Sequence, residues 1–189
     1  MNKTKIIQNI PNILTIIRIL LIPFIIISIL NDEYIMALIF FLLSGTTDIL
    51  DGFIARKFNL ITNLGKLLDP LADKLTQIST LVTITVKGII PYWILLIIFS
   101  KEILMVCGAS FLYGKDTVVS SKWFGKLSTV VLYIAIFLSI VIIYFNLPNE
   151  YIMINMYIYI LAIISTVFSL IMYFKTFYSK DLLNKNKAT

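Results

Sequence analysis

Five acidic side chains fall inside long apolar stretches of this 189-residue sequence, where charged residues are rare. They are Asp48, Asp51, Asp69, Asp73 and Glu102. A charged side chain at the centre of a bilayer costs roughly 2.5–3.5 kcal/mol on insertion scales, so such residues usually face a cavity or a partner. The acids therefore indicate a polar site inside an otherwise apolar protein.

The four aspartates form two pairs with helical spacing. Asp48 and Asp51 are three residues apart and Asp69 and Asp73 are four apart, so each pair shares one face of a helix. The break between the two helices, residues 59–63, is short, which predicts antiparallel neighbours with both pairs at a similar depth. Carboxylates so close cannot all ionise without a counter-ion. Hard divalent cations fit, because Mg²⁺ binds through a few carboxylates together with substrate phosphates.

Two other interpretations of the acids stay open at this point. In one they form buried ion pairs without chemistry, and the candidate partners are Arg56, Lys66, Lys74 and Lys101. In the other they relay protons or cations in a transporter. Small residues nearby let a helix or a flat ligand approach the backbone, and the planar guanidinium of Arg56 matches phosphate.

The remaining composition is that of a membrane protein. Apolar residues make up 59% of the sequence and charged residues 14%, against about 45–50% and about 25% in soluble domains. Histidine is absent, which excludes histidine-based catalysis and metal ligation, and the single cysteine excludes an internal disulfide. Six segments are long enough to span a bilayer as helices: 14–30, 35–57, 64–86, 92–113, 123–145 and 151–174. We therefore expect an all-α bundle of six transmembrane helices, forming one domain over residues 1–189.

The distribution of lysine and arginine predicts the orientation of this bundle. With a cytoplasmic N-terminus, the basic residues outside the predicted spans fall on one side, except Lys87, which lies on the other beside Asp32, Glu33 and Glu150. Both termini are then cytoplasmic, with residues 1–12 as an interfacial lead-in and 175–189 as a basic tail. The net charge of +6 suits anionic lipid headgroups, and no soluble basic face for nucleic acid exists. Asn12 is expected to cap a helix starting near residue 13, which places Arg18 at interface depth.

The acids and small residues together read Asp48-x2-Asp51-Gly52-x2-Ala55-Arg56-x8-Gly65-x3-Asp69-x3-Asp73. This stretch resembles the signature of the CDP-alcohol phosphatidyltransferase family, with every fixed position filled. The resemblance implies a phospholipid-synthesising enzyme of the inner (cell) membrane, with its active site facing the cytoplasm, that transfers the phosphatidyl group of CDP-diacylglycerol to an alcohol and releases CMP. It implies two divalent metals, Mg²⁺ or Mn²⁺, held by the four aspartates, and Asp73 as the general base. The residues that would surround the nucleotide are Asn12, Thr15, Gly52, Ala55, Arg56, Thr62 and Gly65.

The acceptor alcohol is a separate question. Residues 10–18 and 63–74 resemble the bacterial phosphatidylglycerophosphate synthases, which use sn-glycerol 3-phosphate, and cations for its phosphate would be Lys101, Lys122 and Lys126. Snorkelling or the positive-inside bias also explains each lysine. Those synthases usually have Arg-Glu where this chain has Lys101-Glu102. The same stretches occur in the cardiolipin synthases of the family, which use phosphatidylglycerol, so that acceptor is the alternative. The family's usual form is a homodimer.

The position of the polar residues favours an enzyme over a carrier. Carriers spread polar positions through both membrane halves, often in broken helices. Here the outer halves of 123–145 and 151–174 are almost wholly aliphatic and aromatic.

Overall fold

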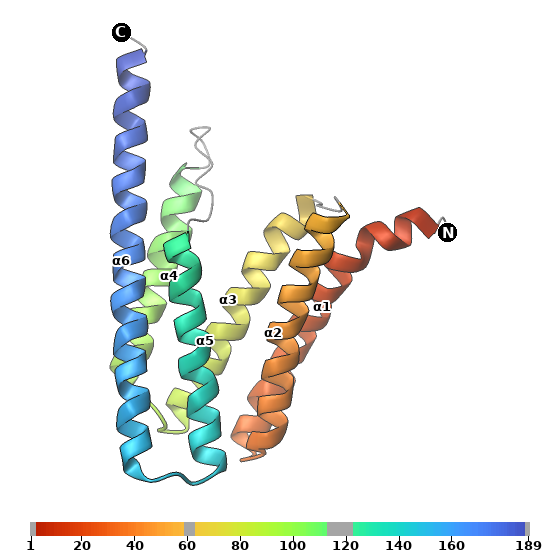
Figure 1. The fold of residues 1–189 in the computed structure, drawn as a ribbon, viewed down its shortest axis with the longest axis vertical. Helices are drawn as coiled ribbons and strands as arrows, with labels where there is room; N and C mark the ends of the chain where they lie inside the picture. Colours follow the sequence, from red (N-terminus) through yellow and green to blue (C-terminus); the bar gives the residue numbers. More distant parts are fainter. Residues whose placement is uncertain (1–2, 59–62, 113–122, 188–189) are drawn as a thin grey trace. The chain divides into compact units, whose positions relative to one another are not determined.

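The computed structural model describes residues 3–58, 63–112 and 123–187, and these form six α-helices (Figure 1). The helices are α1 (Lys3–Leu30), α2 (Tyr34–Lys57), α3 (Asn63–Val86), α4 (Tyr92–Leu112), α5 (Trp123–Tyr144) and α6 (Asn149–Lys187). Side chains are described for all of these residues except 3–10, 56, 63–64, 66–67, 105–112, 123–124, 173–174 and 176–187. The prediction of an all-α protein is confirmed for the described residues, and α2 to α5 begin and end within one residue of the predicted segments.

α1 starts much earlier than the sequence suggested. It begins at Lys3, and Pro11 lies inside it. The expectation that Asn12 caps a helix starting near residue 13 was therefore wrong. Proline lacks an N–H group and its ring clashes with the carbonyl four residues before it, which bends a helix without ending it when the surroundings hold both parts. Figure 1 shows the first turns of α1 bending away from the rest of the helix.

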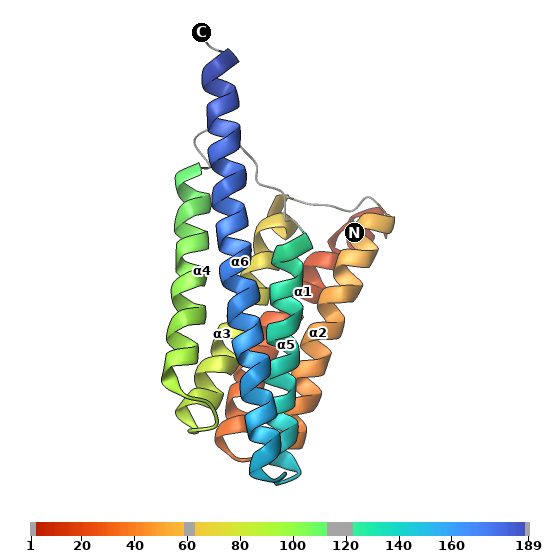
Figure 2. The ribbon, with the colours of Figure 1, turned by 60° about the vertical axis from the view of Figure 1, so that its left-hand side comes forward.

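α6 is the longest helix, with 39 residues. Its apolar part runs from Asn149 to Met172, and the residues that the sequence marked as a basic tail continue the same helix to Lys187. Figures 1 and 2 show α6 as one straight rod that extends past the end of α4.

The chain divides into two compact units. The first comprises Met1–Ile89 and Ile136–Leu147, and in it α1 packs against both α2 and α3, whereas α2 and α3 contact each other much less. Its core includes the fully buried side chains of Ile25, Ile29 and Ile84. Because α1 separates α2 from α3 over most of their length, the expectation that α2 and α3 are direct neighbours holds only in small part.

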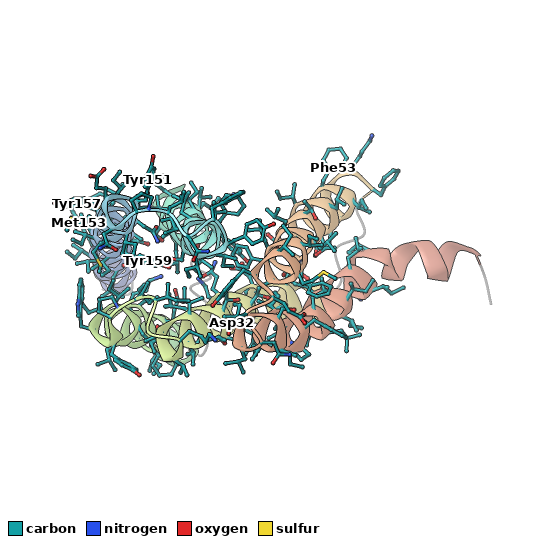
Figure 3. The ribbon with its side chains drawn as sticks, turned by 90° about the horizontal axis from the view of Figure 1, so that it is seen from below. Asp32, Phe53, Tyr151, Met153, Tyr157 and Tyr159 are labelled. Carbon is teal, nitrogen blue, oxygen red and sulfur yellow. The ribbon has the colours of Figure 1, made fainter. Side chains whose placement is uncertain are left out.

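The second unit comprises Ile90–Ala135 and Pro148–Thr189. Here α4 packs against α6, and the buried side chains include Ile94, Ile98 and Tyr159. Figure 3 shows Tyr157 on the outer side of α6 and Tyr159 on the opposite side. The exposed fractions agree, at 71% for Tyr157 and 0% for Tyr159. An outward face of large apolar side chains is what a helix in contact with lipid requires.

Four helical segments in the described part of the chain are long and apolar enough to cross a bilayer: Pro11–Leu30, Tyr34–Ala55, Gly125–Tyr144 and Asn149–Met172. α3 has 24 residues, which is sufficient length, but it carries Asp69, Asp73 and Lys74 and is less apolar. Helices of 20 or more residues reach across a hydrocarbon core of about 30 Å.

A polar cluster joins the turn between α1 and α2 to the end of α3. The Nζ atom of Lys87 lies 2.5 Å from Oδ1 of Asp32 and donates to the carbonyl oxygen of Leu30 at 3.3 Å. The hydroxyl of Tyr34 donates to the same Asp32 oxygen. Asp32, labelled in Figure 3, has a φ of 64°, a left-handed conformation that aspartate tolerates better than most residues. The cluster therefore connects α1, α2 and α3 at the end of the helices where α1 is followed by α2.

Candidate active site

The two aspartate pairs lie on α2 and α3, and α1 supplies side chains to both. Asp48 and Asp51 are on the last turns of α2, and Asp69 and Asp73 are near the start of α3. The side chain of Asp51 is almost fully buried, whereas that of Asp48 is 44% exposed. The first pair therefore has one carboxylate inside the helix packing and one at its surface.

Arg18 of α1 contacts both carboxylates of the first pair. Its Nη1 atom lies 2.7 Å from Oδ1 of Asp48, and its Nη2 atom donates a hydrogen bond to Oδ2 of Asp51. The guanidinium is fully buried within the protein, and its expected position at interface depth stays a prediction. Arginine keeps its charge in proteins and presents donors in a rigid fork, so one side chain can hold two carboxylates.

Thr15 lies one turn before Arg18 on α1 and reaches the second pair. Its hydroxyl donates to Oδ1 of Asp69 at 2.6 Å, and it also lies 3.1 Å from the carbonyl oxygen of Pro11. A hydroxyl has one proton, and the shorter distance with the charged acceptor favours the bond to Asp69. α1 is therefore bonded to both α2 and α3 at the level of the aspartates.

Asp73 lies one turn beyond Asp69 on α3. The side-chain amide of Gln77, itself buried, donates to Oδ1 of Asp73 at 3.4 Å. Since Gln77 is four residues after Asp73 on the same helix, the two side chains share a face. This contact is weak by distance, and it fixes which way one oxygen of Asp73 is turned.

The chemistry of these donors fits a divalent metal. The carboxylate of Asp51 lies within electrostatic range of Arg18, Asp48 and Asp69, and Arg18 is the nearest countercharge. All four candidate ligands present only oxygen atoms, which Mg²⁺ and Mn²⁺ prefer. Among the residues that the structure describes, no three such side chains stand close enough to hold one ion together. There the charge of Asp48 and Asp51 is balanced by Arg18.

The residues expected around a nucleotide are placed only in part. Asn12 on α1 and Gly52 and Ala55 on α2 are half-buried, and Gly65 at the start of α3 is buried. Thr15, also in this set, is engaged with Asp69. The side chain of Arg56 and the whole of Thr62 lie outside the described residues. The described members of this set belong to the first unit, as the four aspartates do, and their role with a nucleotide stays a prediction.

The lysines expected to bind the acceptor phosphate belong to the second unit or lie outside the described residues. Lys101 on α4 is buried, and its Nζ atom donates to Oε1 of Glu102 at 2.9 Å. Lys126 near the start of α5 is exposed, and Lys122 lies outside the described residues. The role of all three stays a prediction.

Arg18 is the residue of this site that sequence analysis missed. An arginine near the end of an apolar segment is usually a snorkelling residue, and its partners lie 30 and 33 positions away on another helix. One feature of the sequence could have identified Arg18 as part of the site. It is a cation within an apolar helix, and the next helix carries two acids that need a countercharge.

Comparison with known proteins identifies the class. The sequence model of the CDP-alcohol phosphatidyltransferase family matches residues 8–174. The chain belongs to this family, as the sequence resemblance indicated, and is therefore a phosphatidyltransferase of phospholipid biosynthesis. Together with its apolar helices, family membership makes it a multi-pass membrane enzyme and removes the transporter interpretation.

Individual relatives carry two different names. The chain is 37% identical over 136 residues to CDP-diacylglycerol–glycerol-3-phosphate 3-phosphatidyltransferase of Bacillus subtilis, covering 64% of this chain and 70% of the relative. It is 34% identical to the protein of the same name from Aquifex aeolicus, covering 65% and 70%. It is also 39% identical over 110 residues to a CMP-forming cardiolipin synthase of Streptomyces coelicolor, covering 55% of this chain and 51% of that protein.

Proposed function

We propose that this enzyme transfers the phosphatidyl group of CDP-diacylglycerol to sn-glycerol 3-phosphate, releasing CMP and forming phosphatidylglycerophosphate. The observation that carries the proposal is the family match over residues 8–174, which contains both aspartate pairs, together with the names of the Bacillus and Aquifex relatives. Those two relatives are matched over more of their length than the cardiolipin synthase is.

Asp73 acts as the general base in this proposal. It takes the proton of the acceptor hydroxyl as the hydroxyl oxygen forms a bond to the phosphorus that bears diacylglycerol. The bond from that phosphorus to the bridging oxygen of the diphosphate breaks, and its electron pair leaves with CMP. Gln77 donates to Oδ1 of Asp73, and this contact turns the carboxylate that would receive the proton. The acyl chains stay in the bilayer, because the aspartates lie at the ends of α2 and α3 and not at their centres.

Two divalent cations, Mg²⁺ or Mn²⁺, are proposed to bind to Asp48, Asp51, Asp69 and Asp73. When bound, such ions neutralise charge on the diphosphate and make CMP a better leaving group. The chemistry of the side chains supports this role, because all four donors present carboxylate oxygens, which Mg²⁺ and Mn²⁺ prefer.

The membrane arrangement that we propose has six spans, with both termini and the aspartates on the cytoplasmic side of the inner (cell) membrane. The lengths of α3 and α4, 24 and 21 residues, support two spans beyond the four most apolar ones. The lysine asymmetry supports the orientation. A homodimer is proposed from the family resemblance alone.

The second candidate function is a cardiolipin synthase that uses phosphatidylglycerol as the acceptor. The Streptomyces relative favours it. So does the contact of Lys101 with Glu102, since a lysine that shares its charge with a neighbouring carboxylate attracts a free phosphate less strongly.

An acceptor screen on the purified protein in detergent distinguishes the two. CDP-diacylglycerol and Mg²⁺ or Mn²⁺ are supplied, and CMP release is followed with glycerol 3-phosphate, phosphatidylglycerol, inositol phosphate or serine. We expect release that depends on glycerol 3-phosphate and is abolished by chelation. Release with phosphatidylglycerol alone selects the second candidate. The control is the Asp73→Asn variant, which should stay folded and release no CMP. If this variant releases CMP at the wild-type rate, Asp73 is not the general base.

A further inference from the structure

We propose that α1 is the positioning element of the metal site, because Arg18 and Thr15 each hold carboxylates by one oxygen and leave the other oxygen for the cation. This inference rests on the proposed metal-dependent function, and it assigns to two α1 residues a role that the aspartate signature on α2 and α3 does not contain.

The first argument is the choice of atoms. Arg18 forms an ion pair with Oδ1 of Asp48 and donates a hydrogen bond to Oδ2 of Asp51, and Thr15 donates a hydrogen bond to Oδ1 of Asp69. The second oxygen of each of these carboxylates accepts no hydrogen bond from the residues that the structure describes. Carboxylates that bind metals are commonly fixed in this way, with one oxygen held by a protein donor.

The second argument is the side from which the donors come. Arg18 and Thr15 are fully buried in the packing of α1 against α2 and α3, whereas the side chain of Asp48 is 44% exposed. The donors therefore hold the carboxylates from inside the helix packing, and the exposed part of the first pair belongs to Asp48.

The third argument is the geometry of the guanidinium. Arg18 contacts two carboxylates that are one helical turn apart through two different nitrogen atoms. A lysine has the same charge, but its single nitrogen at the end of a flexible chain does not reproduce the planar fork. Arg18→Lys therefore keeps the electrostatic effect of the cation on a metal nearly constant and removes mainly the positioning.

The test measures metal binding without substrate. Purified protein in detergent is stripped with a chelator, Mn²⁺ alone is titrated, and the thermal unfolding midpoint is followed as the signal. We expect Arg18→Lys and Thr15→Val each to raise the Mn²⁺ concentration for half-maximal stabilisation by about 10–100-fold, the usual effect of losing such a partner. Thr15→Ser, which keeps the hydroxyl, is the matched control and should behave as the wild type does.

The outcomes separate this inference from the proposed function. Suppose that Arg18→Lys and Thr15→Val both need the same Mn²⁺ concentration for half-maximal stabilisation as the wild type, while Asp51→Asn no longer responds to Mn²⁺. That result overturns the role of α1 and leaves the metal site intact. No Mn²⁺-dependent stabilisation of the wild type overturns both proposals. Arg18→Lys alters a buried charged contact and could prevent folding, which would appear as the absence of a cooperative unfolding transition in chelator. Thr15→Val changes no charge, so it is expected to fold and then provides the comparison by itself.

Discussion

The proposed role of Asp73 as the base can be tested through Gln77, because Gln77 donates to Asp73 and has no charge of its own. Gln77→Met keeps the side-chain volume and removes the donor to Asp73 Oδ1. A hydrogen bond of this kind contributes about 0.5–1.5 kcal/mol, so we expect kcat to fall about 2–10-fold. The KM for CDP-diacylglycerol should be unchanged, since Gln77 acts through Asp73 and not on the nucleotide.

Steady-state CMP release by the Gln77→Met variant checks this expectation. A rise in KM with unchanged kcat would contradict it, because that pattern indicates lost substrate binding. Asp73→Asn, in which the base itself is missing, provides the lower limit of activity for comparison.

The residues proposed to do the chemistry were predictable from the sequence, and those proposed to position them were not. Asp48, Asp51, Asp69 and Asp73 stand out because acids in apolar helices are rare and their spacing is helical. Arg18 is also an intramembrane charge, but no local spacing connects it with α2. Its importance follows only from the packing of α1, which a single sequence does not specify.

Among the connections between helices, the turn after α3 contains Gly88 in an unusual backbone conformation. This glycine has a φ of +74°, a left-handed conformation that costs a residue with a Cβ about 1–2 kcal/mol. We expect Gly88→Ala to destabilise the protein by about that amount. Gly45 in α2 is the matched control, because a Cβ there meets nothing within 4 Å and alanine favours the helix by about 0.5–1 kcal/mol.

Thermal unfolding of both variants in detergent measures the difference. The prediction is opposite in sign for the two substitutions: a lower midpoint for Gly88→Ala and an equal or higher one for Gly45→Ala. Equal destabilisation by both would show that the φ of Gly88 is not what matters at that turn.

The cluster of Asp32, Tyr34 and Lys87 makes the junction of α1, α2 and α3 sensitive to pH. The hydrogen bond from Lys87, followed by that from Tyr34, holds the pKa of Asp32 below its usual value. A carboxyl group with a lowered pKa stabilises the folded state above the pKa of the unfolded chain, and that contribution is lost as the pH falls through the folded value. We therefore expect the wild type to lose thermal stability in acid through this group.

Asp32→Asn cannot ionise and isolates the effect. Between neutral pH and about pH 3, below the usual aspartate pKa, its unfolding midpoint should fall less steeply than that of the wild type. Parallel pH profiles of the two proteins would contradict the assignment of this acid sensitivity to Asp32.

Helix positions were predictable wherever a long apolar segment ended in charged or turn-forming residues. The start of α1 was not, because Pro11 and Asn12 are typical of a helix start and here lie inside a bent helix. The adjacency of α2 and α3 was overestimated for a related reason. A short connection favours neighbours, but the packing of α1 between them decides the contacts.

For the whole molecule, the proposed topology predicts which side of the membrane each terminus faces. In a Cys107→Ala background, single cysteines at Asn2→Cys and Ala188→Cys should react with a membrane-impermeant maleimide only after the cytoplasmic side is opened. Glu150→Cys, in the first turn of α6, should react from the outside. Labelling of the two terminal cysteines from opposite sides would contradict an even number of spans.

The helical continuation of α6 changes how far its lysines reach. The fifteen residues after Met172 extend the rod by about 22 Å at about 1.5 Å per residue, more than two Debye lengths at physiological ionic strength. A flexible tail would let every lysine fold back onto anionic headgroups. If the proposed topology sets this rod along the membrane normal, the backbone at Lys175 stays within the surface potential while that at Lys187 lies beyond it. Only the first part of the basic segment then senses the lipid composition, and the far end faces an essentially screened solution.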